Sequence, residues 1–311
     1  MAVLGRRKFL RGAAGGAAGL SVGLWGFRSA FVEAQPVETK VVDLGGGIHV
    51  LTLGASNVLA VADGEGVALV DGGTRAHSAE LLQRIAALPG AGDIHTLFNT
   101  HWHPEQTGSN EVLGKSGARI ISQENTRLWL TTDVTWPWNG QTVEPLPKVA
   151  QPNETFYTDQ TLAVGKKAAR CGYLRDCPHT DGDIYVFFPD DNVLAAGGAV
   201  TGSGWPTIDW WTGGWIGGIV GGLETLLTVV DSQTRVVPAE GPVLTKVDLE
   251  RQHEMYGAIW ERLAKTLYSG GGTQEALAAD PAKEFTATMG PSDDFVVRAF
   301  HSLWAYLSPD A

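Results

Sequence analysis

The spacing of apolar residues divides the first half of the chain into short strands followed by helices. Four apolar runs are separated by glycine and aspartate, which is typical of antiparallel strands joined by turns. These runs are residues 41–44, 48–53, 57–62 and 67–71. Residues 76–88 then have helical spacing, and buried strands are predicted at 94–99 and 118–122, the latter with a helical continuation.

The second half of the chain repeats this order. Its predicted strands are residues 161–174, 184–188, 193–196 and 235–238. Its predicted helices are residues 219–231, 273–280, 292–307 and a long amphipathic helix from residue 246, which has His253 on its apolar face as an expected core histidine. Strands followed by a helix, given twice, predict two packed sheets with helices outside them, in a single domain.

The first 34 residues have the composition of an export signal. A basic stretch with the paired Arg6 and Arg7 precedes an uncharged, Gly- and Ala-rich run at 12–27, and small residues follow at 32–34. This segment resembles a twin-arginine signal, which implies export to the periplasm. A membrane anchor is the alternative, but the uncharged run is shorter than the roughly 20 residues that span a bilayer. We therefore expect residues 35–311 to form the single domain, and membrane contact only through an uncleaved signal.

Composition and charge narrow the classes of partner. Apolar residues make up 43% and charged residues 18% of the chain, which favours a globular core. The formal net charge is −11, and it becomes −15 without residues 1–34, which hold five basic residues and one acidic residue. Such an acidic protein repels nucleic acid, so we expect no nucleic-acid partner.

The two cysteines leave their redox state open. Cys171 and Cys177 are six residues apart, a separation of about 20 Å along an extended strand. A disulfide needs Cα atoms within about 7 Å, so the two can pair only if a turn lies between them. Gly172 and Asp176 permit such a turn without requiring it.

The segment at residues 99–110 carries the first candidate chemistry. His101 and His103 directly follow a predicted buried strand, and two histidines at this spacing can converge on one metal ion. Imidazole nitrogens are suitable ligands for zinc. The pair alone is a weak signal, because His-x-His in a loop also occurs without a metal.

Five segments, taken in order, resemble the motifs of the metallo-β-lactamase superfamily. They are residues 70–73, 99–110, 178–183, 189–198 and 237–241. The resemblance covers about residues 40–245. It implies an α/β fold, a four-layer αββα sandwich, with C-terminal helices beyond it and a two-metal site at the ends of the strands.

The resemblance also assigns the metal ligands position by position. The three histidines of the first metal are all present: His101, His103 and His179. The ligand positions of the second metal hold Glu105, Gln106, Gly198 and Glu240. Because an amide is a poor zinc ligand and glycine has no side chain, we expect at most one zinc ion per chain.

Three neutral histidines with an open fourth position can hold zinc and activate a water molecule. Glu105 and Glu240 are then the expected catalytic carboxylates beside that water. The first hypothesis is a periplasmic mono-zinc hydrolase acting on an ester, amide, lactone or similar bond. The alternative is an inactive fold that binds a ligand or serves as a subunit of a periplasmic assembly, because four of the seven ligand positions differ.

Tryptophans gather in two segments that, by the resemblance, flank the mouth of the metal site. They are Trp129, Trp136 and Trp138 in one segment, and Trp205, Trp210, Trp211 and Trp215 in the other. Such residues suit a small-molecule substrate of apolar or ring-bearing character, and they suit a protein partner equally well. Ordinary packing of the loops is the third interpretation.

Overall fold

The computed structural model describes residues 39–307, which lie in one compact unit. A seven-stranded mixed sheet occupies the first half of this unit. In spatial order, its strands are β1 (Thr39–Asp43), β2 (Ile48–Leu53), β3 (Ser56–Ala62), β4 (Val67–Val70), β5 (Ile94–Phe98), β6 (Arg119–Gln123) and β9 (Glu154–Phe156). Strands β1 to β4 form an antiparallel meander, and β4, β5, β6 and β9 run parallel to one another.

A five-stranded sheet follows in the second half. In spatial order, its strands are β10 (Gln160–Val164), β11 (Lys167–Tyr173), β12 (Ile184–Phe188), β13 (Val193–Gly197) and β14 (Arg235–Pro238). Only the β13–β14 pair of this sheet is parallel. The short strands β7 (Val134–Thr135) and β8 (Thr142–Val143) pair in a separate hairpin that lies between β6 and β9 in the sequence.

Helices connect and follow the strands. The α-helices are α1 (Ser78–Ala86), α2 (Pro104–Thr107), α3 (Asn110–Lys115), α4 (Glu124–Trp129), α5 (Ile216–Val229), α6 (Lys246–Tyr268), α7 (Thr273–Ala278), α8 (Thr286–Met289) and α9 (Asp293–Leu307). The 3-10 turns are η1 (Arg75–His77), η2 (Lys148–Ala150), η3 (Trp210–Thr212) and η4 (Lys283–Phe285).

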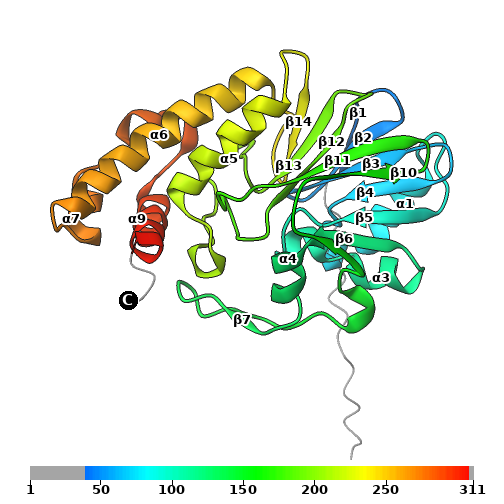
Figure 1. Cartoon of the computed structure of the whole chain (residues 1–311), viewed down its shortest axis with the longest axis horizontal. Helices are drawn as coiled ribbons and strands as arrows, with labels where there is room; N and C mark the ends of the chain where they lie inside the picture. The colour runs from blue at the N-terminus through cyan, green and yellow to red at the C-terminus, as the bar shows by residue number, and fades with distance from the viewer. Residues whose placement is uncertain (1–38, 308–311) are drawn as a thin grey trace, which may run out of the picture. The chain divides into compact units, whose positions relative to one another are not determined.

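The alternation of side chains along the strands builds the layers. On β4, Val70 faces the core between the two sheets, whereas Leu69 packs toward the outer helices with Leu81 of α1. On β12 of the other sheet, Val186 faces the same central core and Phe187 packs with α5, α6 and α9. Helices therefore cover both outer faces of the paired sheets (Figure 1). The predicted α/β fold, a four-layer αββα sandwich, is confirmed.

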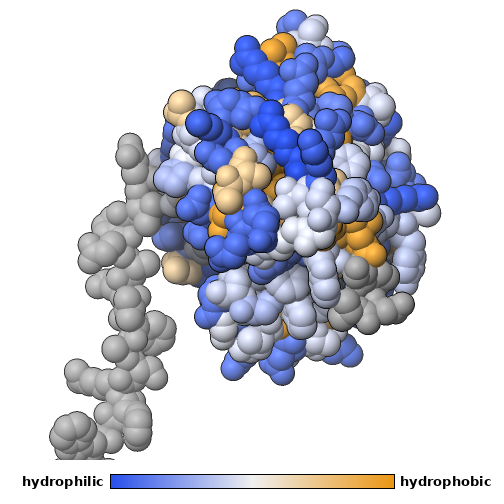
Figure 2. All heavy atoms as spheres, turned by 90° about the vertical axis from the view of Figure 1, so that its left-hand side faces the viewer, coloured by the Kyte–Doolittle hydropathy of each residue, from blue (hydrophilic) through white to orange (hydrophobic). Residues whose placement is uncertain are grey.

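The face of the molecule on the side of α6, α7 and α9 is mainly hydrophilic, with apolar side chains in small separate groups (Figure 2). His253 lies on α6 as expected, but its core position was wrong: the side chain is 32% exposed and contacts Glu224 of α5. No helix among residues 39–307 is long and apolar enough to cross a membrane. The predicted export signal lies outside the described residues.

Candidate metal centre

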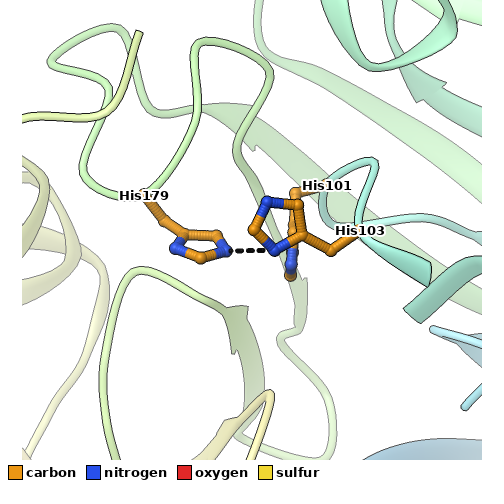
Figure 3. A group of neighbouring side chains, drawn as sticks. All are labelled: His101, His103 and His179. Carbon is orange, nitrogen blue, oxygen red and sulfur yellow. Dashed lines mark hydrogen bonds between the residues drawn. The ribbon is translucent and has the colours of Figure 1, made fainter. Parts of the chain in front are cut away.

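Three histidines from two loops meet at one end of the sheets. His101 and His103 follow β5, and His179 lies in the loop that leads into β12 (Figure 3). Their ligand nitrogens all lie within 4.8 Å of one another, and Nε2 of His179 is 3.1 Å from Nδ1 of His103. Nitrogens that bind one tetrahedral zinc ion are about 3.3 Å apart. The upper limit of 4.8 Å for the distances between the three nitrogens is larger than this value, so the rings would have to move slightly closer together to bind zinc in a tetrahedral geometry.

The outer ring nitrogens of two histidines are fixed by hydrogen bonds. Nε2–H of His103 donates to the Asp209 carboxylate at 2.9 Å, and Nδ1–H of His179 donates to the carbonyl of Thr207 at 2.6 Å. Because these partners are acceptors, each outer nitrogen carries the ring proton. Nδ1 of His103 and Nε2 of His179 are then unprotonated and face each other.

His101 is fixed in the same way through a hydroxyl. The Thr100 hydroxyl donates to the buried Asp71 carboxylate at 2.8 Å, so its lone pair is left to accept from Nδ1–H of His101 at 3.0 Å. The Asp71 carboxylate also accepts from the backbone N–H of Thr100 at 2.8 Å. Nε2 is therefore the nitrogen of His101 that can bind a metal ion.

Burial favours the neutral form of two of these imidazoles, His101 and His179. It lowers the pKa of His179 to about 3, with repulsion from His103 as the next cause. It also lowers the pKa of His101 well below 6.5, again with repulsion from the other two rings. Neutral imidazole is the form that binds a metal ion.

The donor set fits a metal ion. When both rings are neutral and their outer nitrogens are protonated, the 3.1 Å contact between His103 and His179 brings two lone pairs together, which is unfavourable unless a cation lies between them. In zinc sites, the ligand histidines usually donate their other ring N–H to a carboxylate, a backbone carbonyl or a water molecule, as His103 and His179 do here.

The loops behind the histidines are held by buried polar groups. Asp183 accepts hydrogen bonds from the backbone N–H groups of His179 and Thr180, at 2.7 and 2.8 Å, and from the Thr180 hydroxyl at 2.7 Å. Burial raises the pKa of Asp183 to about 7, although these hydrogen bonds act in the opposite direction. Asp183 therefore shapes the loop that carries His179.

The histidines open into a cleft of about 320 Å³. Glu105 and Glu240 line this cleft, and both are exposed at its rim. Partial burial and the nearby charge of Glu105 raise the pKa of Glu240. The loop of Glu240 is fixed by the Asn57 side chain, which donates to the carbonyls of Pro238 and Gly241 at 3.0 and 2.8 Å.

Comparison with known proteins agrees with this architecture. A sequence model of the metallo-beta-lactamase superfamily matches residues 51–240. The chain belongs to the metallo-beta-lactamase superfamily.

Three solved structures of similar proteins share the fold. A metallo-beta-lactamase from Pontibacter korlensis is 20% identical with a TM-score of 0.56, and the match covers 71% of this chain and 99% of that chain. The DIM-1 metallo-beta-lactamase is 17% identical with a TM-score of 0.57, covering 71% and 97% of the two chains. The IND-7 enzyme is 17% identical with a TM-score of 0.55, covering 72% and 100%. At this level of identity, the likeness extends to the fold alone.

Two of the ligand positions for the second metal, Gln106 and Gly198, have surroundings in the structure that disfavour a metal ligand there. Gln106 is buried and lies within hydrogen-bonding reach of His101. A Cβ atom at Gly198 would lie 2.4 Å from Cδ2 of His179, so the His179 ring occupies the space that a side chain would need. A carboxylate does not fit at position 198 with the ring where it is.

The tryptophans divide between several sites. Trp136, Trp138 and Trp205 line the cleft. Trp129 instead donates its indole N–H to Asp181 at 2.7 Å. Trp215 stacks on Tyr306 with the ring centroids 3.7 Å apart. The two tryptophan segments therefore contribute both to the cleft and to packing away from it.

Sequence reasoning missed two groups that support the histidines, Asp209 and the Thr207 carbonyl. Asp209 is fully buried, and it also accepts from the indole N–H of Trp136 at 3.1 Å and the backbone N–H of Thr212 at 3.1 Å. Burial favours a raised pKa for Asp209, but the hydrogen bonds from His103 and Thr212 act in the opposite direction, and the pKa lies below its usual value. The only signal in the sequence was a carboxylate beside the tryptophan pair at 210–211.

The cysteines do not pair. Cys171 is buried on β11, Cys177 is partly buried in the turn that follows, and both are free thiols.

Proposed function

We propose that this chain is a hydrolase that uses a single zinc ion held by His101, His103 and His179. The observation that carries the proposal is the direction of the ring nitrogens: three imidazoles, each with its outer nitrogen held by a hydrogen bond, turn their inner nitrogens toward one point. A zinc ion held in this way supplies a Lewis acid and lowers the pKa of water to about 7.

The chain's own residues supply proton transfer and orientation. We assign Glu105 as the group that accepts a proton from the attacking water and passes it to the leaving group as the ester, amide or lactone bond breaks. Glu240, across the same cleft, orients that water. Among the described residues, neither carboxylate makes a hydrogen bond or ion pair with the histidines, which leaves the fourth coordination position open.

The cleft supports a substrate with apolar or ring-bearing character, because Trp136, Trp138 and Trp205 line it beside the histidines. We further propose that the protein works in the periplasm after export through its twin-arginine segment. Changing Arg6 and Arg7 to lysine should then retain the protein in the cytoplasm, as measured by cell fractionation against an unchanged control.

Metal content is the first test. Mass spectrometry of the purified chain should find one zinc per chain, and His179→Ala should find none, because two histidines rarely retain the ion. Two tightly held metals would contradict the single-site proposal.

Turnover is the second test, measured on a panel of chromogenic esters, amides and lactones. Glu105→Gln should keep zinc bound and slow turnover by roughly 10²–10⁴-fold, the usual worth of a positioned general base. Full cellular function in the His179→Ala variant would favour the alternative, a ligand- or partner-binding protein without catalysis.

A further inference from the structure

The C-terminal helix α9 brings a basic side chain to the cleft. Phe295 of α9 stacks on Trp205, a cleft residue, with ring centroids 4.5 Å apart and planes 14° from parallel. About two turns further along α9, the Ser302 hydroxyl accepts from the backbone N–H of Ile216 at 3.1 Å. These contacts fix the helix before and after Arg298 in the sequence, and Arg298 lines the same cleft as the three histidines.

The Arg298 guanidinium lies over an aromatic platform. Its Cζ is 5.1 Å from the centroid of Trp138, and Trp138 in turn stacks on Trp136 with centroids 5.7 Å apart. Within residues 39–307, no carboxylate forms an ion pair with Arg298. The guanidinium is thus held in place by an indole ring, and its N–H donors remain available to a ligand.

The charges around the cleft are arranged unevenly. Glu105 and Glu240 are its carboxylates, and Arg298 is a cation that none of its acidic groups neutralises. An anionic group that enters is repelled by the two glutamates and attracted by Arg298. An aromatic surface beneath a guanidinium also shields it from water on one side and strengthens its hydrogen bonds.

We propose that Arg298 binds a carboxylate of the substrate, so that the substrate class is an acid with an apolar or aromatic body. This inference rests on the proposed function only for the cleavage of the bound molecule. The binding of the carboxylate by Arg298 does not depend on hydrolysis. A planar guanidinium forms two parallel hydrogen bonds with a carboxylate, which sets the orientation of the bound molecule as well as its affinity. Trp136 and Trp138 contact the apolar body, and the scissile bond is directed toward the histidines.

The test measures binding to the metal-free chain, so that it is independent of zinc and of turnover. The probes are 4-phenylbutanoate and the neutral amide of the same acid, titrated by calorimetry or by shifts of tryptophan NMR signals. The wild-type chain should bind the acid about tenfold more tightly than the amide, the size expected for a charge-assisted hydrogen bond. Equal affinity, or no binding of the acid at roughly 10 mM, would overturn the proposal.

Variants identify the group responsible. Arg298→Gln should lose the preference for the acid, and Arg298→Lys should keep part of it, because it retains the charge without the planar pair of donors. Arg170→Gln is the matched control: the Arg170 guanidinium also lies over a ring, 5.8 Å from Phe187, but away from the cleft. A preference that survives in Arg298→Gln, or disappears equally in Arg170→Gln, would refute the assignment even if zinc content and hydrolysis are as proposed.

Discussion

At the scale of single residues, the histidines depend on the groups behind them. An imidazole can bind a metal through either nitrogen, and the hydrogen bond at the other nitrogen decides which one is free. Here a carboxylate, a backbone carbonyl and a hydroxyl each fix one ring. Of these three groups, Asp209 can be tested by mutation most directly, because its side chain makes the contact with His103.

Asp209→Ala should lower zinc affinity by about 10–100-fold, the usual effect of removing a carboxylate that orients a ligand histidine. Asp209→Asn should restore part of the loss, because the amide oxygen can still accept from His103. Competition with a chromogenic chelator measures both. Asp191→Ala, which removes the partner of Lys167 away from the site, is the control and should bind zinc normally. Unchanged affinity in Asp209→Ala would show that His103 needs no orientation.

Gly198 provides a second residue-scale prediction. Gly198→Ala places a Cβ 2.4 Å from Cδ2 of His179, so the ring must move, and zinc affinity should fall at least about tenfold. Gly257→Ala in α6 is the matched control, because no heavy atom lies within 4 Å of its added Cβ. That control should keep zinc affinity and gain about 0.5–1 kcal/mol of stability from helix propensity. Normal zinc binding by Gly198→Ala would mean that the His179 ring has room to move.

At the scale of elements, most of the secondary structure follows from apolar spacing. The run at 48–53 became β2 with the predicted bounds, and residues 246 onward became the long helix α6. The stretch 161–174, predicted as one β-like segment, is the hairpin of β10 and β11. Strands β7, β8 and β9 were missed, because two or three residues are too few to establish a period.

The sequence predicted those residues of the site that belong to short motifs, but not the residues that reach the site through tertiary packing. His101 and His103 stand together in one motif, and His179 lies in another, so the resemblance could name all three. The partner of His103 is 106 residues away, at Asp209 immediately before η3. Arg298 comes from a helix beyond residue 240, where the family match ends. Contacts of this kind arise from tertiary packing, which periodicity does not encode.

The first turn of α6 offers an element-scale prediction. The Asp248 carboxylate accepts from the backbone N–H of Thr245 at 2.8 Å and from its hydroxyl at 2.7 Å. Asp248→Ala should therefore reduce the free energy of unfolding by about 1 kcal/mol, as measured by urea titration. Glu254→Ala, on an exposed position inside the same helix, should stay within about 0.5 kcal/mol of the wild type. If the two changes lowered the free energy of unfolding equally, the hydrogen bonds of Asp248 at the N-cap would not account for the stability of this turn.

At the scale of the whole molecule, the site belongs to both halves of the chain. Histidines 101 and 103 follow a strand of the first sheet, whereas His179 and Glu240 come from loops of the second. Asn57 of β3 joins the two by holding the loop after β14. The central core between the sheets must therefore remain intact for the cleft to keep its geometry, and Cys171 lies in that core.

Cys171 gives the core a pH-dependent stability. Burial raises the pKa of its thiol from 9.0 to about 12, so above pH 9 the unfolded chain loses this proton while the folded chain keeps it. The unfolded state then binds fewer protons, and the free energy of unfolding falls as pH rises, by about 1.4 kcal/mol per pH unit for this group. In urea titrations from pH 8 to about 10.5 under reducing conditions, Cys171→Ala should show a shallower slope, and the difference should grow from near zero at about pH 8 toward that amount above about pH 10. The buried tyrosines contribute equally to both proteins and cancel in the comparison. Parallel curves for variant and wild type would mean that the thiol ionises in the folded core as readily as in the unfolded chain.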